Sequence, residues 1–105
     1  MNLDSLSFGV GATYTSGSDR YPATVVGWKE FKSGPNAGEI REIIVQTDKY
    51  EAVSGQWPDL EYAYTRNPDG RTLAFRKNAK GRFVLVGGGS YLHVGERRYY
   101  NDPHF

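Results

Sequence analysis

Near the end of this sequence two arginines are followed directly by two tyrosines, as Arg97, Arg98, Tyr99 and Tyr100. An arginine guanidinium pairs with phosphate oxygens through a fixed fork of N–H donors, and a tyrosine ring stacks on a nucleobase. The run therefore favours a surface that binds an anionic ligand, either nucleic acid or a nucleotide. The alternative is a solvated tail whose tyrosines pack on the rest of the domain, because acidic residues flank the run.

A second group of basic residues precedes that run, and it consists of Arg66, Arg71, Arg76, Lys77, Lys80 and Arg82. On a strand, Arg76 points away from the face that carries Leu73 and Phe75, so it should be exposed. We therefore add Arg76 and Arg82 to the predicted ligand-binding residues. Ordinary surface solubility explains the same charges about equally well.

Trp57 precedes Pro58, which lacks a backbone donor and cannot continue a strand ladder. A tryptophan in such a loop is a candidate anchor for a protein contact. The alternative is that Trp57 folds back and caps one end of the fold. The sequence thus predicts Trp57 as a protein-contact residue and leaves the capping role open.

The chain has few side chains suited to catalysis or metal binding. His93 and His104 are its only histidines and it has no cysteine, which excludes thiol chemistry, disulfides and a three-histidine metal centre. His93 alternates with Leu92 and Val94 as a strand residue does, which favours a structural role. A serine triad is disfavoured because no strand-turn-helix elbow presents Ser90. We predict no enzyme, no metal site and no cofactor.

The chain has 105 residues, the size of one domain, and a formal net charge of +1. We predict a single β domain over residues 1–105, in which residues 97–105 are a candidate extended tail. A net charge this close to zero indicates neither the strongly basic surface that is typical of nucleic-acid-binding proteins nor an acidic tail. The first residues lack the positive flank and apolar core of a signal peptide, and no apolar run approaches about 18 residues. We therefore expect a cytoplasmic protein with no membrane partner.

Thirteen glycines, eight tyrosines and five phenylalanines against one methionine favour pleated strands separated by tight turns. Alternation between turn signals predicts strands within residues 8–15, 21–32, 39–52, 60–66, 71–77, 82–86 and 91–95. The turn Asn67-Pro68-Asp69-Gly70 predicts that residues 60–66 and 71–77 pair as a β-hairpin. A bulge is expected near Gly27, and residues 53–59 are predicted to form a loop.

A small sheet of strands this short is most stable when it closes and leaves no unpaired edge. The sequence therefore predicts an all-β fold, a small antiparallel barrel or sandwich of about six or seven strands. A small barrel of the Src-homology or KOW type is favoured. The strand order, and the choice between barrel and sandwich, stay open.

Several short motifs together resemble small proteins of unknown function that are encoded by bacteriophages and prophages. They are Tyr21-Pro22-Ala23-Thr24-Val25-Val26, Gln46-Thr47-Asp48, Tyr62-Ala63-Tyr64, Asn67-Pro68-Asp69-Gly70, Phe75-Arg76-Lys77-Asn78, Gly81-Arg82-Phe83 and Val94-Gly95-Glu96-Arg97-Arg98-Tyr99-Tyr100-Asn101-Asp102-Pro103. The resemblance spans about residues 21–105 and implies a viral accessory protein in the cytosol of a bacterial host. It implies no reaction, because none of the motifs is chemically diagnostic.

The predicted function is that of a non-enzymatic accessory module that binds nucleic acid or a nucleotide through the Arg/Tyr run, with help from Arg76 and Arg82. One alternative is a protein-binding counter-defence module that blocks a host factor through Trp57 and exposed tyrosines. Another is a structural protein of virion assembly, for which a homo-oligomer is expected.

Overall fold

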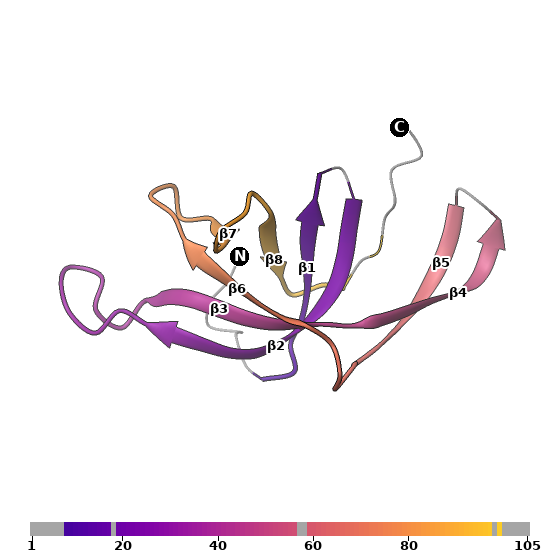
Figure 1. Cartoon of the computed structure of the whole chain (residues 1–105), viewed down its shortest axis with the longest axis horizontal. Coiled ribbons are helices and arrows are strands. Elements are labelled where there is room, and N and C mark those ends of the chain that lie inside the picture. The colour runs from indigo at the N-terminus through magenta and orange to yellow at the C-terminus, as the bar shows by residue number, and fades with distance from the viewer. Residues whose placement is uncertain (1–7, 18, 57–58, 98, 100–105) are drawn as a thin grey trace.

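The computed structural model describes residues 8–17, 19–56, 59–97 and 99, which form eight strands joined by turns (Figure 1). The strands are β1 (Gly11–Ser16), β2 (Asp19–Glu30), β3 (Ile40–Thr47), β4 (Lys49–Gln56), β5 (Asp59–Thr65), β6 (Thr72–Lys77), β7 (Phe83–Leu85) and β8 (Tyr91–Val94). Successive residues of a strand face opposite sides of the sheet, so the alternation in the sequence separates an inner from an outer face.

Six of the strands close into an antiparallel barrel in the order β1-β2-β3-β6-β7-β8, with β8 pairing back onto β1. The all-β barrel that the sequence favours is confirmed. Among the described residues, β4 and β5 pair only with each other and form a two-stranded ribbon, here called the arm. Figure 1 shows the arm extending from the barrel where β3 continues into β4. The molecule is therefore elongated, with extents of 51 × 28 × 24 Å.

The barrel encloses a small core of apolar side chains. Its buried members are Ala12, Ala23, Val25, Ile43, Val45, Phe75, Phe83 and Leu92. β1 and β2 contribute two alanines and Val25, whereas β3, β6, β7 and β8 contribute larger side chains, so small and large residues together fill a narrow interior. Burying one of the larger side chains contributes about 1.5–3 kcal/mol relative to leaving it exposed. This core holds the strands in register and thereby sets the positions of the outward-facing residues.

The predicted bulge near Gly27 is confirmed. Val25 pairs with Val45 and Gly27 pairs with Ile44, so Val26 is the extra residue on β2. The extra residue lets two adjacent valines occupy one strand without both entering the core, because the bulge shifts the alternation. Val25 is fully buried, whereas Val26 is half-buried.

The hairpin predicted for residues 60–66 and 71–77 is wrong, although the turn between them forms. β5 pairs with β4 and β6 pairs with β3, so the two segments belong to different sheets. The turn keeps its local hydrogen bond, from the Gly70 N–H to the Asn67 carbonyl at 2.9 Å. The Thr47 N–H donates to the Arg71 carbonyl at 3.0 Å and carries the β3–β6 ladder up to this turn. β3 and β4 are thus the outgoing side, and β5 and β6 the returning side, of one long ribbon.

Contacts with the end of β3 explain why the turn lies against the ribbon instead of closing a hairpin. The Gln46 side-chain amide donates to the carbonyls of Pro68 and Gly70, at 3.0 and 3.1 Å. Gly70 lies so close to Thr47 that a Cβ at this position would overlap the Thr47 carbonyl oxygen. The glycine is therefore required by this close approach of two backbone segments.

The loop predicted for residues 53–59 is also wrong over part of its length. β4 continues to Gln56, and Gln56 pairs with Asp59, the first residue of β5. The ladder of the arm thus extends through most of the predicted loop. Trp57 and Pro58 lie outside the described residues, and with them the predicted protein contact of Trp57.

Candidate ligand-binding surface

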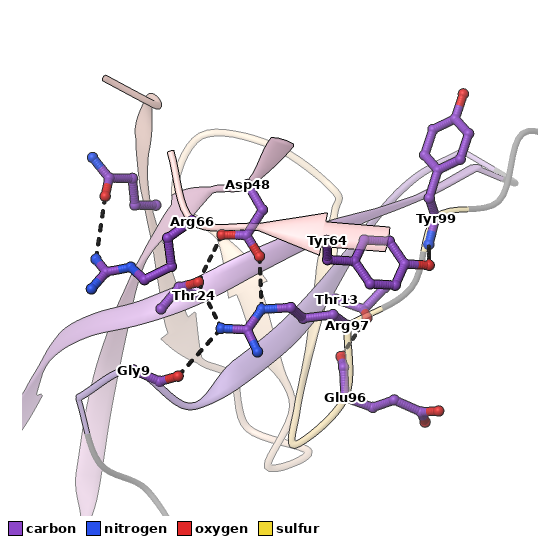
Figure 2. Close-up of polar contacts among 10 residues, drawn as sticks. Gly9, Thr13, Thr24, Asp48, Tyr64, Arg66, Glu96, Arg97 and Tyr99 are labelled. Carbon is purple, nitrogen blue, oxygen red and sulfur yellow. Dashed lines mark hydrogen bonds and ion pairs between the residues drawn. The ribbon is translucent and has the colours of Figure 1, made fainter. Parts of the chain in front are cut away.

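Arg97 follows β8, and its guanidinium contacts three separate segments of the chain (Figure 2). Its Nε–H donates to the Asp48 carboxylate at 2.8 Å, and Nη2 donates to the Thr24 hydroxyl at 2.9 Å. Nη2 also donates to the Gly9 carbonyl at 3.3 Å. The Thr24 hydroxyl in turn donates to the second Asp48 oxygen at 2.7 Å. These four residues form a polar network that we call the arginine clamp.

The arginine clamp compensates a buried charge. The Asp48 side chain is 1% exposed, and a carboxylate removed from water is strongly unfavourable unless it is paired and hydrogen-bonded. Gly11 allows the Arg97 side chain to pass this close to β1, because a Cβ on Gly11 would lie 2.8 Å from Nη1. The Arg97 guanidinium is therefore bound to a buried carboxylate although 29% of its side chain is exposed, and a phosphate would have to compete with Asp48 for it.

Tyr99 packs among tyrosines of the barrel and the arm, namely Tyr21, Tyr50, Tyr62 and Tyr64, which we call the tyrosine cradle. Its ring stacks on Tyr50 with centroids 3.9 Å apart. Its backbone N–H donates to the Tyr64 hydroxyl at 2.8 Å (Figure 2). Burial, followed by the neighbouring Tyr50 hydroxyl, raises the pKa of Tyr99 to about 12. Tyr99 thus fits the alternative in which a tyrosine of the run packs on the rest of the domain.

Arg76 is exposed, as its place on β6 predicts, with 59% of its side chain accessible. Its guanidinium nevertheless pairs with Glu42 of the neighbouring β3 at 3.3 Å. Lys29 pairs with the other Glu42 oxygen at 3.5 Å, and the Glu42 side chain is only 6% exposed. Two cations therefore share one buried carboxylate, and one net positive charge remains at this part of the surface.

Arg82 is the predicted residue whose surroundings best suit a ligand. It precedes β7, and its guanidinium carbon lies 5.6 Å from the ring centroid of the exposed Tyr91 on β8. The turn before Arg82 is held by Asn78, whose side-chain oxygen accepts from the backbone N–H groups of Lys80 and Arg82 at 3.0 and 2.9 Å. Thr15 holds Tyr91 in the same way, since its hydroxyl accepts from the Tyr91 N–H at 3.0 Å. Both side chains thus project from a fixed backbone.

A shallow groove of about 530 Å³ runs beside Arg82 and Tyr91, and we call it the β7–β8 groove. It is lined by Thr15, Gly81, Arg82, Phe83, Tyr91, Leu92, His93 and Val94. A second hollow of about 330 Å³ shares His93 and Val94 with it and adds Thr13, Arg20 and Glu96. The outer face of β8 therefore gathers an arginine on each side of His93.

Sequence reasoning missed Tyr91 and His93 as site residues and placed His93 in a structural role. Strand alternation contains the signal that would have found them. The buried Leu92 lies between Tyr91 and His93, so both of these side chains face outwards. What the alternation does not show is that the β1–β2 hairpin and the segment leading into β7 bring Arg20 and Arg82 to either side of β8. That arrangement depends on closure of the barrel.

The predicted ligand residues are thus not brought into a single site. Arg97 and Tyr99 lie in the arginine clamp and the tyrosine cradle, Arg76 pairs with Glu42, and Arg82 lines the β7–β8 groove. Arg98 and Tyr100 lie outside the described residues. Within the part of the chain that the structure describes, no group of three His, Asp or Glu side chains is arranged to hold a metal ion.

Comparison with known proteins returned no matching family model, no matching curated protein and no matching solved structure. The resemblance to bacteriophage proteins, and that to Src-homology or KOW barrels, therefore stay predictions from the sequence. The described residues contain no helix with the length and apolar character needed to span a bilayer.

Proposed function

We propose that this protein is a non-enzymatic binding module for an anionic ligand that carries a planar ring, a nucleotide or a single-stranded nucleic acid, and that the β7–β8 groove binds it. One observation carries the proposal. Arg82 lies over the exposed ring of Tyr91 in a groove, and among the described residues Arg82 forms no ion pair with a carboxylate.

The charge balance of the three described arginine candidates favours Arg82. Arg97 is bonded to a buried aspartate, and Arg76 to a buried glutamate. A phosphate at either position must replace an existing partner, which offsets much of the gain. At Arg82 a phosphate replaces only water, and charge-assisted hydrogen bonds to it contribute about 1.5–3 kcal/mol.

The aromatic partner supplies the second half of the recognition. The Tyr91 side chain is exposed on β8 and lines the groove beside Arg82, which is where a base would stack on it. Base–aromatic stacking contributes about 1–3 kcal/mol per base and tolerates any sequence. His93 and Arg20 lie further along the same outer face, in a hollow that Glu96 also lines, and Arg20 is there the group that would pair with a second phosphate of a strand. The groove therefore suits a flexible single strand at least as well as a mononucleotide.

The test is a fluorescence-anisotropy titration with a labelled oligothymidine and, separately, a labelled adenosine diphosphate, each at low and high salt. Arg82→Ala should weaken binding by about tenfold or more, and Tyr91→Ala should weaken it without changing the salt dependence. Arg41→Ala removes the same charge from an exposed position on β3 and serves as the matched control.

The outcomes separate the ligand classes. Binding of the oligomer alone identifies a single-stranded nucleic acid, and equal binding of both probes identifies a nucleotide. Affinity that is independent of salt, or that Arg82→Ala and Arg41→Ala reduce equally, would contradict the proposal. Arg98→Ala in the same titration tests the predicted contribution of the Arg/Tyr run.

A second function is favoured by the arm. Both outer edges of this two-stranded ribbon are unpaired among the described residues, and it exposes 59% of Val53 and 40% of Tyr50. Unpaired edges and exposed apolar side chains are typical of surfaces that bind another protein. Affinity capture from a bacterial lysate should then recover one stoichiometric partner. Light scattering distinguishes a homo-oligomer, as expected for an assembly protein. A viral accessory role in either case rests on the resemblance in short motifs.

A further inference from the structure

The tyrosine cradle lies between the barrel and the arm and surrounds a single ring. Tyr21 belongs to β2, whereas Tyr50 and Tyr62 belong to β4 and β5. We propose that this cradle is a binding site for the aromatic side chain of an extended peptide, and that Tyr99 occupies the site from within the chain.

The contacts of Tyr99 define what the site recognises. Its ring is stacked on Tyr50 at 3.9 Å and 18°, meets Tyr62 edge-on at 4.8 Å and 73°, and is tilted against Tyr21 at 5.7 Å and 56°. The contact with Tyr62 has the edge-to-face geometry that aromatic pairs prefer, the contact with Tyr21 is tilted, and the stack on Tyr50 is closer than the preferred centroid separation of about 4.5–7 Å. Beside the ring, the Tyr64 hydroxyl accepts the Tyr99 backbone N–H at 2.8 Å. A planar ring with an adjacent backbone N–H is what any tyrosine in an extended peptide presents.

The environment of the cradle selects a neutral ring over a charged ligand. The Tyr99 ring makes aromatic contacts with the phenol rings of Tyr21, Tyr50 and Tyr62. Burial there raises the pKa of Tyr99 to about 12, which means that negative charge is disfavoured at this point. A phosphate-bearing nucleotide is therefore a poor occupant. The cradle differs in this respect from the β7–β8 groove, so the two sites are expected to bind different ligands.

The attachment of Tyr99 allows exchange with a partner. Arg97 is held independently by Asp48 and Thr24, so the chain stays anchored when the Tyr99 ring leaves the cradle. The walls belong to the barrel and to the arm, and Tyr14 extends the barrel side by stacking on Tyr21 at 5.5 Å. Tyr99 then acts as a tethered competitor, with an effective concentration of about millimolar order for a short tether.

The experiment uses N-acetyltyrosinamide, which carries the same ring and the same adjacent N–H as Tyr99. The full chain with Tyr99→Ala is titrated with this probe, and the ring resonances of Tyr50, Tyr62 and Tyr64 are followed by NMR. Saturable shifts of these resonances are expected, and in the unaltered protein binding should be at least about tenfold weaker because Tyr99 competes. N-acetylalaninamide is the matched probe control, and Phe8→Ala, which removes an exposed ring that belongs to neither the cradle nor the β7–β8 groove, is the matched protein control.

Three results would overturn the proposal. They are the absence of saturable shifts in a folded Tyr99→Ala protein, equal binding to that protein and to the unaltered one, and binding of adenosine in place of N-acetyltyrosinamide. If Tyr99→Ala does not fold, Tyr99→Leu keeps an apolar side chain in the cradle without stacking. The same shifts are then expected at higher probe concentration, and their absence would refute the site equally.

Discussion

The arginine clamp and the β7–β8 groove use the same residue types to opposite effect. In the clamp, the charge of Arg97 is paired with the buried carboxylate of Asp48, whose side chain is only 1% exposed. In the groove, Arg82 has an aromatic face beside it and solvent beyond it. The difference lies in the neighbour that the fold supplies: a buried aspartate makes an arginine part of the framework, and an exposed tyrosine leaves its charge free to bind.

The largest effect is expected from Arg97→Ala. The substitution leaves the Asp48 carboxylate buried without its cation, and removing one partner of such a pair costs about 3–5 kcal/mol. We expect a loss of that order in the free energy of unfolding, measured by urea denaturation followed by circular dichroism.

The control for this prediction is the same substitution in an Asp48→Asn background. The asparagine carries no charge that needs compensation, so Arg97→Ala should there cost much less, and the cycle isolates the coupling of the pair. Equal losses in both backgrounds would show that Arg97 stabilises the protein through packing and its hydrogen bonds to Thr24 and Gly9, without its charge pairing with Asp48. The contrast with Arg82 would then lose its electrostatic basis.

An intermediate effect is expected at alkaline pH from the tyrosine cradle. Burial raises the pKa of Tyr99 from 10.0 to about 12, and it raises the pKa values of Tyr14 and Tyr21 as well. Because the unfolded chain releases these protons first, the free energy of unfolding should be unaffected by them below pH 10 and should fall between pH 10 and about 12. Urea denaturation across this range measures the fall.

Tyr99→Phe sharpens this prediction, since it keeps a ring in the cradle and removes the ionisable hydroxyl. The decline in stability above pH 10 should become shallower in this variant. An unchanged decline would show that the cradle does not disfavour the charged form of Tyr99, which would weaken the contrast between an apolar cradle and a cationic groove.

The smallest effect on stability is expected from Arg82→Ala. Arg82 is exposed and pairs with no carboxylate among the described residues, so the free energy of unfolding should change by less than about 0.5 kcal/mol. A thermal or urea unfolding curve measures this change. A loss comparable with that of Arg97→Ala would show that Arg82 stabilises the fold. Weaker ligand binding by this variant would then be explained by unfolding and not by the loss of a contact with the ligand.

Much of the local structure follows from the sequence. The bulge at Gly27, the turn at residues 67–70 and the exposure of Arg76 depend on neighbouring residues, so their signals are short-range. Strand pairing is not short-range. The turn at residues 67–70 predicts that residues 60–66 pair with 71–77, but β5 pairs with β4, in which Gln56 lies opposite Asp59, and the turn folds against Gln46 and Thr47.

The candidate site, too, is predicted from the sequence only in part. Alternation about Leu92 indicates that Tyr91 and His93 share an outer face, and this much is present in the sequence. That Arg82 lies over Tyr91, however, depends on the pairing of β7 with β8. That the charge of Arg97 is paired depends on Asp48, which lies 49 positions away in the chain.

By itself the sequence determined where strands form, from alternation, and where the chain reverses, at glycine and proline. It also determined that arginines and tyrosines are the side chains suited to ligand recognition. Only the tertiary structure decided which of those arginines are neutralised and which tyrosines are covered. The physical reason is that burial and pairing are properties of contacts between distant segments. The energy of a charge depends on those contacts far more than on its neighbours in the chain.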